Sequence, residues 1–157
     1  MEQPHSPEEA LRRLGHTLPE APKPVAAYVP AVRSGSLLFV AGQIPVSGGK
    51  LLMTGSVPGA VSLEDAQRCA RQCALNGLAV AKAELGSLDR ITRVVRLGCF
   101  VASEASFVDQ PKVANAASEL MLEVFGEAGR HARAAVGSIS LPLGAPVEIE
   151  FLFEVRD

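Results

Sequence analysis

Aromatic residues are scarce in this sequence: among 157 residues there is no tryptophan, one tyrosine and six phenylalanines. Proteins that bind single-stranded nucleic acid stack bases on aromatic side chains and surround them with lysine and arginine. Here 15 basic residues face 17 acidic ones, the formal net charge is −2, and the two signs are interspersed. The sequence therefore offers neither a stacking platform nor a basic stripe, which argues against nucleic acid as a partner.

Long apolar runs are also absent. No run approaches the roughly 20 residues that a membrane-spanning helix needs. The acidic first ten residues lack the apolar segment of a secretory signal. With 48% hydrophobic and 20% charged residues, the chain has enough length and apolar content for one domain with its own core. We expect a soluble cytoplasmic protein that does not contact a membrane.

Cysteine is sparse as well, with Cys69, Cys73 and Cys99 as the whole complement. An odd number of cysteines argues against a closed disulfide framework. Cys69 and Cys73 lie four apart in a helical pattern and could offer two metal ligands, but no histidine lies near them in the sequence. Small buried apolar side chains are the better interpretation. We therefore expect neither a metal nor a cofactor.

The first 24 residues have a character of their own. Ser6, followed by a proline and by Glu9 three residues on, is typical of a capped helix start, which predicts a short helix at about 6–15. Three prolines then make an extended linker. We interpret residues 1–24 as an arm that lies on a single domain formed by residues 25–157.

The remaining chain alternates between strand and helix patterns. The predicted elements are strands at 25–32, 37–46 and 50–54, a helix at 62–85, a strand at 91–103, a helix between 109 and 126, and strands at 132–140 and 147–155. This βββ-α-β-α-ββ order predicts an α+β fold with a six-stranded mixed sheet. Right-handed crossovers would place both helices on one face. The other face is too apolar to stay wet, so we expect a closed symmetric oligomer.

Two charged residues stand out in the last two strands. Arg133 is flanked by alanines, and Glu148 lies between two apolar residues fifteen positions later. One interpretation is a hairpin in which Arg133 forms a cross-strand pair with Glu148 or Glu150, an arrangement that contributes little stability. The other is a small-walled pocket in which the guanidinium binds a carboxylate and Glu148 positions a water molecule. The residues alone leave both open.

Other catalytic patterns are weaker. Gly48-Gly49 lacks the Lys-Ser pair and the helix of a phosphate-binding loop. His131 could serve as a base for Ser138 or Ser140, although nothing in the spacing requires it.

Several segments together resemble the RidA (YjgF) family of reactive-intermediate imine deaminases. They are YVPAVRSGSLLFVAGQIPV, the helix at 62–86, and HARAAVGSISLPLGAPVEIE. The resemblance covers about residues 24–156. It implies a chorismate-mutase-like α+β fold and a homotrimer with active sites in the clefts between subunits.

The resemblance also assigns roles to individual residues. Arg133 takes the place of the arginine that binds the substrate carboxylate, and Glu148 that of the glutamate that holds the hydrolytic water. Tyr28 matches a pocket tyrosine, Gly42 a glycine whose backbone faces the substrate, and Asn115 an asparagine of the second helix.

Three departures accompany these matches. Ala135 stands where the family often has a cysteine, so only its backbone carbonyl could contact the substrate and a thiol has no role. His131 replaces the proline of the family motif. The arm at 1–24 is longer than in compact members and resembles a longer subgroup.

The function that the resemblance implies is hydrolysis of 2-imino acids to 2-keto acids and ammonia, by an enzyme without metal or cofactor whose partner is a small carboxylate-bearing substrate. Two alternatives stay open. The protein could bind a small carboxylate as a regulator without turnover, or it could be an endoribonuclease or translation inhibitor, as some family members have been described.

Overall fold

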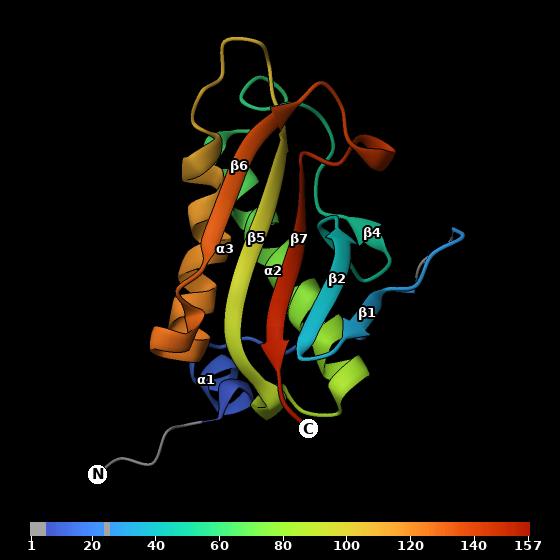
Figure 1. Ribbon diagram of the computed structural model, residues 1–157. Coiled ribbons are helices and arrows are strands. Elements are labelled where there is room, and N and C mark those ends of the chain that lie inside the picture. Colours follow the sequence, from blue (N-terminus) through green and yellow to red (C-terminus); the bar gives the residue numbers. More distant parts are fainter. Residues whose placement is uncertain (1–5, 24–25) are drawn as a thin grey trace.

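The computed structural model describes residues 6–23 and 26–157, and its central feature is a mixed β-sheet (Figure 1). Five strands lie side by side in the order β1-β2-β7-β5-β6. Their bounds are Ala31–Ser34 (β1), Leu37–Gln43 (β2), Ile91–Ala102 (β5), Ala132–Ser138 (β6) and Val147–Val155 (β7). β5 and β6 run parallel, whereas the pairs β1–β2, β2–β7 and β5–β7 are antiparallel.

Two long helices, α2 (Leu63–Leu85) and α3 (Gln110–Phe125), cover one face of this sheet. In Figure 1, α2 lies behind the strands, and α3 lies at the left, beside and partly behind β6. The chain enters α3 from the end of β5 and leaves it toward β6, so the helix makes the crossover that a parallel pair requires. The expected α+β fold, with two helices on one face, is confirmed.

The start, the end and the close packing of α2 follow from individual residues. Ser62 Oγ accepts a hydrogen bond from the backbone N–H of Asp65 at 3.1 Å, and Gly86 ends the helix with a φ of 84°. A Cβ atom placed on Gly77 would stand 2.5 Å from the ring of Phe151. Glycine at this position therefore lets the helix backbone approach the sheet.

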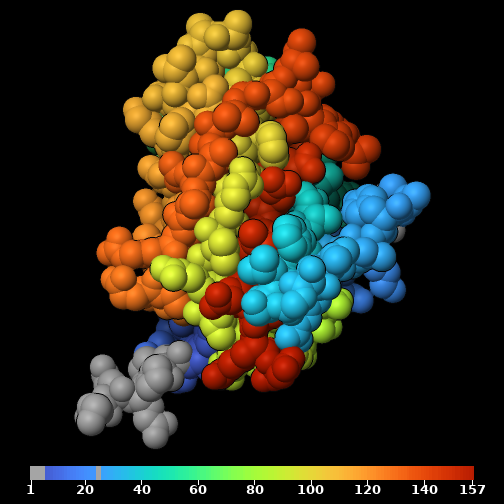
Figure 2. Space-filling model, in the orientation of Figure 1, coloured from blue at the N-terminus to red at the C-terminus, as the bar shows by residue number. Residues whose placement is uncertain are grey.

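The two faces of the sheet differ in what they meet. Along β7 every second residue is buried beneath the helices: Val147, Ile149, Phe151, Phe153 and Val155. The residues between them point to the opposite face, which we call the open face. Figure 2 shows this face with no helix across it. Apolar side chains also lie there, with Phe39 48% and Val136 46% exposed.

The main sheet has five strands rather than the six expected. The segment at 50–54 forms only β4 (Lys50–Leu51), which pairs with β3 (Val46–Ser47) in a separate two-stranded sheet. Pro45, which has no N–H to donate to a ladder, separates this hairpin from β2. The strand expected at 25–32 is shorter too, since β1 begins only after Pro30; Val25 lies outside the described residues.

The last two strands do not form a hairpin. β5 lies between β6 and β7 and pairs with both of them. A cross-strand pair between Arg133 and Glu148 or Glu150 is therefore wrong as an interpretation. The physical reason is the crossover through α3, which brings β6 to the far edge of β5 instead of beside β7.

The arm contributes α1 (Pro7–Arg13), slightly shorter than the helix expected at 6–15. Its Leu11 is only 2% exposed and belongs to the main core. Glu8 forms an ion pair with Lys82 of α2 at 3.3 Å, so the helix is held by both apolar and charged contacts. The division of the chain at residue 24 remains a prediction. None of the helices in 6–23 and 26–157 has the length and hydropathy to cross a membrane.

Candidate functional site

Arg133 lies on the edge strand β6, and its side chain belongs to the helix-covered face. Its register partner on β5 is Leu97, which pairs in turn with Phe151, and both are buried. Directly paired residues on neighbouring strands point to the same face of a sheet. The guanidinium reaches α3, where Nη1 donates to Asn115 Oδ1 at 2.8 Å. Two residues that the sequence assigned to the site are therefore in contact.

Within the described residues, neutral acceptors alone hold this guanidinium. Nη1 also donates to Ser118 Oγ at 3.1 Å, and Nη2 donates to the carbonyl of Pro111 at 3.4 Å. No carboxylate in 6–23 and 26–157 lies within ion-pair distance of Arg133. Nη1 uses both of its hydrogens, whereas Nε–H and one Nη2 hydrogen have no acceptor among these residues. Nε and Nη2 flank one edge of the guanidinium, which matches the fork of a carboxylate.

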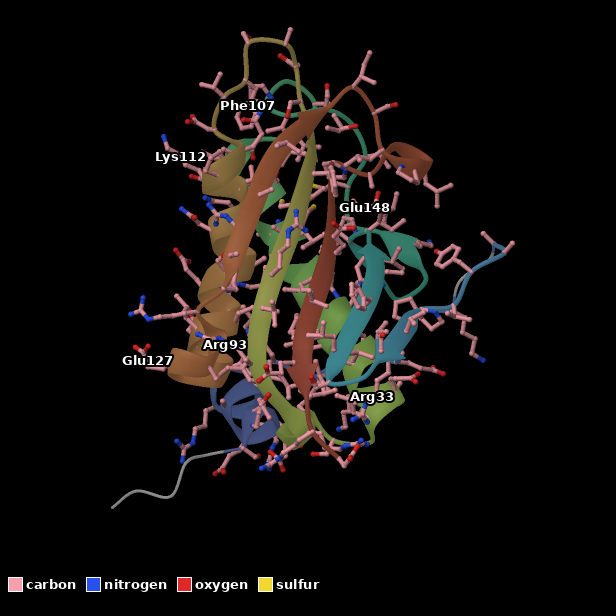
Figure 3. All side chains as sticks on the ribbon, in the orientation of Figure 1. Arg33, Arg93, Phe107, Lys112, Glu127 and Glu148 are labelled. Carbon is pink, nitrogen blue, oxygen red and sulfur yellow. The ribbon has the colours of Figure 1, made fainter. Side chains whose placement is uncertain are left out.

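Glu148 lies near the start of β7, next to the end of β2, as Figure 3 shows. The carboxyl is half-buried, and this burial raises its pKa above the usual 4.5; the negative charge of Glu150 raises it further. Gly42 lies against the same carboxyl. A Cβ atom on Gly42 would collide with Glu148 Oε1, so the missing side chain leaves the room that Glu148 occupies.

Tyr28 and Gly42 line one hollow of about 130 Å³ on the surface. Its wall includes Pro30 and Ile44 and, from the arm, Pro22 and Lys23. The tyrosine is 53% exposed, so its ring stands at the rim rather than within the core. The arm therefore contributes to the wall of the hollow beside Glu148.

Arg133 and Glu148 do not meet within one chain. Glu148 pairs with Phe100, three residues beyond Leu97, the partner of Arg133. Three is an odd step along a strand, so Glu148 points to the open face and Arg133 to the helix face. The predicted residues thus form two sets: the arginine group (Arg133, Asn115 and Ala135) and the glutamate group (Glu148, Gly42 and Tyr28).

Ala135 lies two residues beyond Arg133 on the same face, beside Cys99 of β5, and packs against the core. Burial raises the pKa of the Cys99 thiol to about 12, although the nearby charge of Arg133 opposes the shift. Burial likewise raises the pKa of Cys69 to about 11, and Cys73 shifts in the same direction. All three thiols are free, buried and protonated, which is not the form that binds metals or attacks carbon.

The sequence did not single out Ser118, and the weak possibility that His131 serves Ser138 or Ser140 finds no support in the contacts of these residues. His131 Nε2 lies 2.9 Å from Ser118 Oγ, whereas Ser138 Oγ donates to the carbonyl of Ser140. One signal was available: Ser118 follows Asn115 by three residues on α3, so both lie on one helix face.

The chain matches the family model described as "YjgF/chorismate_mutase-like, putative endoribonuclease" over residues 8–155. It is 47% identical over 148 residues to Protein TCP17 of Trypanosoma cruzi, a match that covers 94% of this chain and 92% of the relative.

Solved structures show the same fold. Atu1372 from Agrobacterium tumefaciens, a protein of unknown function, superposes with a TM-score of 0.90 at 50% identity, over 96% of this chain and 92% of that one. TdcF of E. coli, solved with bound serine, superposes with a TM-score of 0.64 at 26% identity, over 88% of this chain and 94% of that one.

Proposed function

The chain belongs to the YjgF/RutC family, and from this premise we propose that it is an imine deaminase that hydrolyses 2-imino acids to 2-keto acids and ammonia. The observation that carries the proposal is the way in which the side chain of Arg133 is held. Its guanidinium is fixed by neutral acceptors, has no counter-ion among the described residues, and leaves its Nε hydrogen and one Nη2 hydrogen without an acceptor there. Every 2-imino acid offers a carboxylate that can accept from these two donors. TdcF, the relative solved with bound serine, holds a ligand that is likewise a small carboxylate.

Glu148 supplies the second role. In its ionised form the carboxylate accepts a proton from a water molecule, whose oxygen adds to the imine carbon. Glu148 passes this proton to the imine nitrogen, which gives a carbinolamine that carries a hydroxyl and an amino group on the same carbon. The hydroxyl proton then moves to the nitrogen as the C–N bond breaks, so that ammonia leaves and the oxygen becomes the keto group. Arg133 takes no part in these bond changes; it holds the carboxylate so that the imine carbon faces the water. The residues named here need no metal for this sequence of steps.

A site made of both residues requires more than one subunit. In a homotrimer in which the open face of one subunit meets the β6 edge of the next, the arginine group at that edge would face the glutamate group. Two features support this arrangement: the residues point to opposite faces of one sheet, and the open face carries exposed apolar side chains such as Phe39 and Val136. Burying such side chains between copies removes apolar surface from water.

The deciding experiment is an assay of 2-keto acid and ammonia formation from a 2-imino acid that an amino-acid oxidase generates in the same tube. We expect the protein to accelerate hydrolysis above the spontaneous rate. Binding of a 2-keto acid without acceleration would replace the enzyme with a carboxylate-binding regulator, because the same Arg133 serves both functions. Cleavage of RNA by the same preparation, without imine hydrolysis, would instead favour the endoribonuclease alternative.

A further inference from the structure

Behind Arg133, a chain of hydrogen bonds runs away from the free edge of the guanidinium. Nη1 contacts Ser118 Oγ at 3.1 Å. Ser118 Oγ contacts His131 Nε2 at 2.9 Å, and His131 Nδ1 contacts the carbonyl oxygen of Gly129 at 2.6 Å. These bonds, which we call the relay, connect β6, α3 and the 3-10 turn Gly126–Gly129 (η2).

The chemistry of the groups gives each bond a direction. A guanidinium only donates and a carbonyl oxygen only accepts, so Arg133 donates to Ser118 and His131 Nδ1–H donates to Gly129. Ser118 can then donate its hydroxyl hydrogen to Nε2 of a neutral His131. With this tautomer, assigned from the bonding pattern, every group in the relay has a partner. The Ser118 oxygen, whose own hydrogen points to His131, is turned with its lone pairs toward Arg133.

Gly129, at the end of the relay farthest from Arg133, packs closely against α3. A Cβ atom on Gly129 would collide with the carbonyl oxygen of Met121, so η2 packs directly on the backbone of α3. Ser118 is on that same helix, one turn before Met121. The histidine therefore lies between a turn and a helix that pack backbone against backbone, and its contact with Ser118 links the two.

We propose that Ser118 and His131 are positioning residues, which hold the guanidinium of Arg133 so that its Nε–Nη2 edge faces the substrate carboxylate. This role rests on the proposed function. Asn115 fixes one hydrogen of Nη1 and Ser118 the other, and two fixed hydrogens determine the plane of the guanidinium. Without Ser118, the guanidinium keeps only the Asn115 contact and the longer contact from Nη2 to Pro111, so the whole planar group can tilt and its Nε–Nη2 edge is held less firmly toward the cleft.

The test compares Ser118→Ala and His131→Phe with Ser138→Ala, a matched control on β6 outside the relay. We expect both relay variants to raise KM and the Kd for 2-ketobutyrate about tenfold, with kcat and melting temperature changed much less. Ser138→Ala should resemble the wild type. Ser118→Thr keeps the hydroxyl and His131→Gln keeps an acceptor for it, so both should recover most of the affinity.

A double-variant measurement separates positioning from a structural role. Because the relay acts through Arg133, adding Ser118→Ala to Arg133→Ala should weaken 2-ketobutyrate binding no further. Additive losses, or a lowered melting temperature with unchanged KM and Kd, would overturn the proposal. An active Ser118→Ala protein with an unchanged KM would contradict the positioning role of Ser118 and His131, and the proposed deaminase activity would be unaffected. If the wild-type protein binds 2-ketobutyrate but does not hydrolyse imines, the proposed deaminase activity is wrong. The Kd values of the variants would still test whether Ser118 and His131 position Arg133.

Discussion

Around Arg133, three acceptors from α3 hold the side chain in place, whereas around Glu148 a side chain is missing, at Gly42, and its absence makes the room. The arginine group is thus organised by hydrogen bonds and the glutamate group by space. The first kind of organisation fixes a direction, which suits the recognition of a planar carboxylate. The second leaves a half-buried carboxyl with a raised pKa, which suits a group that exchanges protons.

The largest effect should come from the arginine group. Arg133→Ala should reduce imine hydrolysis about a hundredfold or more, because the substrate carboxylate loses a charge-assisted bidentate contact in a partly desolvated cleft. The thermal transition should remain cooperative, since the side chain lies near the surface of an edge strand. Steady-state kinetics and thermal melting on the same preparation measure both.

Arg130→Ala is the matched control for this variant. Arg130 lies near the same edge but pairs with Glu127 at 3.1 Å and is 69% exposed, so its removal should leave the rate unchanged. Arg133→Lys should recover little of the imine hydrolysis that Arg133→Ala loses, because an ammonium group lacks the forked donor geometry of the guanidinium. Wild-type turnover in Arg133→Ala would contradict the division of roles and return Arg133 to a purely structural one.

The glutamate group should respond to a single added carbon. Gly42→Ala places a Cβ atom against Glu148 Oε1, and the flexible carboxyl end must swing away. We expect kcat to fall about tenfold as the attacking water loses its base, with a much smaller change in the Kd for 2-ketobutyrate.

Gly98→Ala provides the comparison for that variant. Its Cβ atom would meet Oε1 and Cγ of Glu150 and the end of the Arg96 side chain on the same open face, rather than Glu148. A similar loss of kcat in both variants would show that general crowding of the open face, rather than displacement of Glu148, limits the rate.

A mixing experiment tests whether the two groups come from different subunits. Arg133→Ala and Glu148→Gln proteins, each inactive alone, are denatured together in equal amounts and refolded. If each site takes its arginine from one subunit and its glutamate from the next, about a quarter of the sites in random trimers contain both native residues. We therefore expect about a quarter of the wild-type activity.

The control for mixing is each variant refolded by itself, which should stay inactive. Light scattering of the mixture verifies the assembly. A mixture that has assembled but remains inactive would argue for sites within single subunits. Light scattering that shows a monomer would contradict the proposed trimer.

Residue patterns predicted much of this architecture because they depend on neighbours in the sequence. The cap at Ser62, the stop at Gly86 and the alternation along β7 are local features, and they appear as expected. Resemblance then brought Arg133 together with Asn115, and the structure places them 2.8 Å apart.

Features that depend on the order of strands could not be obtained in this way. Arg133 and Glu148 look like the two arms of a hairpin in sequence, and only the insertion of β5 between their strands separates them. The contact between Ser118 and His131 joins a helix to the residue before a strand, across thirteen positions and an intervening turn. No periodicity marks such a pair, because each residue alone fits its own element.

The smallest effect concerns the pH dependence of the glutamate group. Burial raises the pKa of Glu148 above 4.5, and the charge of Glu150 adds to that shift. Activity needs the ionised carboxylate, so the acid limb of the wild-type pH–rate profile should lie above pH 4.5. Glu150→Gln removes a neighbouring negative charge, which favours ionisation of Glu148 and moves the acid limb to lower pH. Glu154→Gln, on the same strand and face but bonded to Thr92, should leave the limb unmoved.

The raised pKa of Glu148 also predicts how the stability of the folded protein depends on pH. Because the folded-state pKa of Glu148 exceeds its unfolded value, the folded protein binds this proton more tightly, and ionisation of the group destabilises it. This contribution is present at low pH and is lost as the pH rises from about 4.5 through the folded pKa. Glu148→Gln does not titrate, so its melting temperature relative to the wild type should increase across that window.

A relative melting temperature that stays flat from about pH 4 to about pH 7, with an acid limb that Glu150→Gln does not move, would show that the carboxyl of Glu148 is solvated like any surface glutamate. The glutamate group would then lose the proton-exchanging role that distinguishes it from the arginine group.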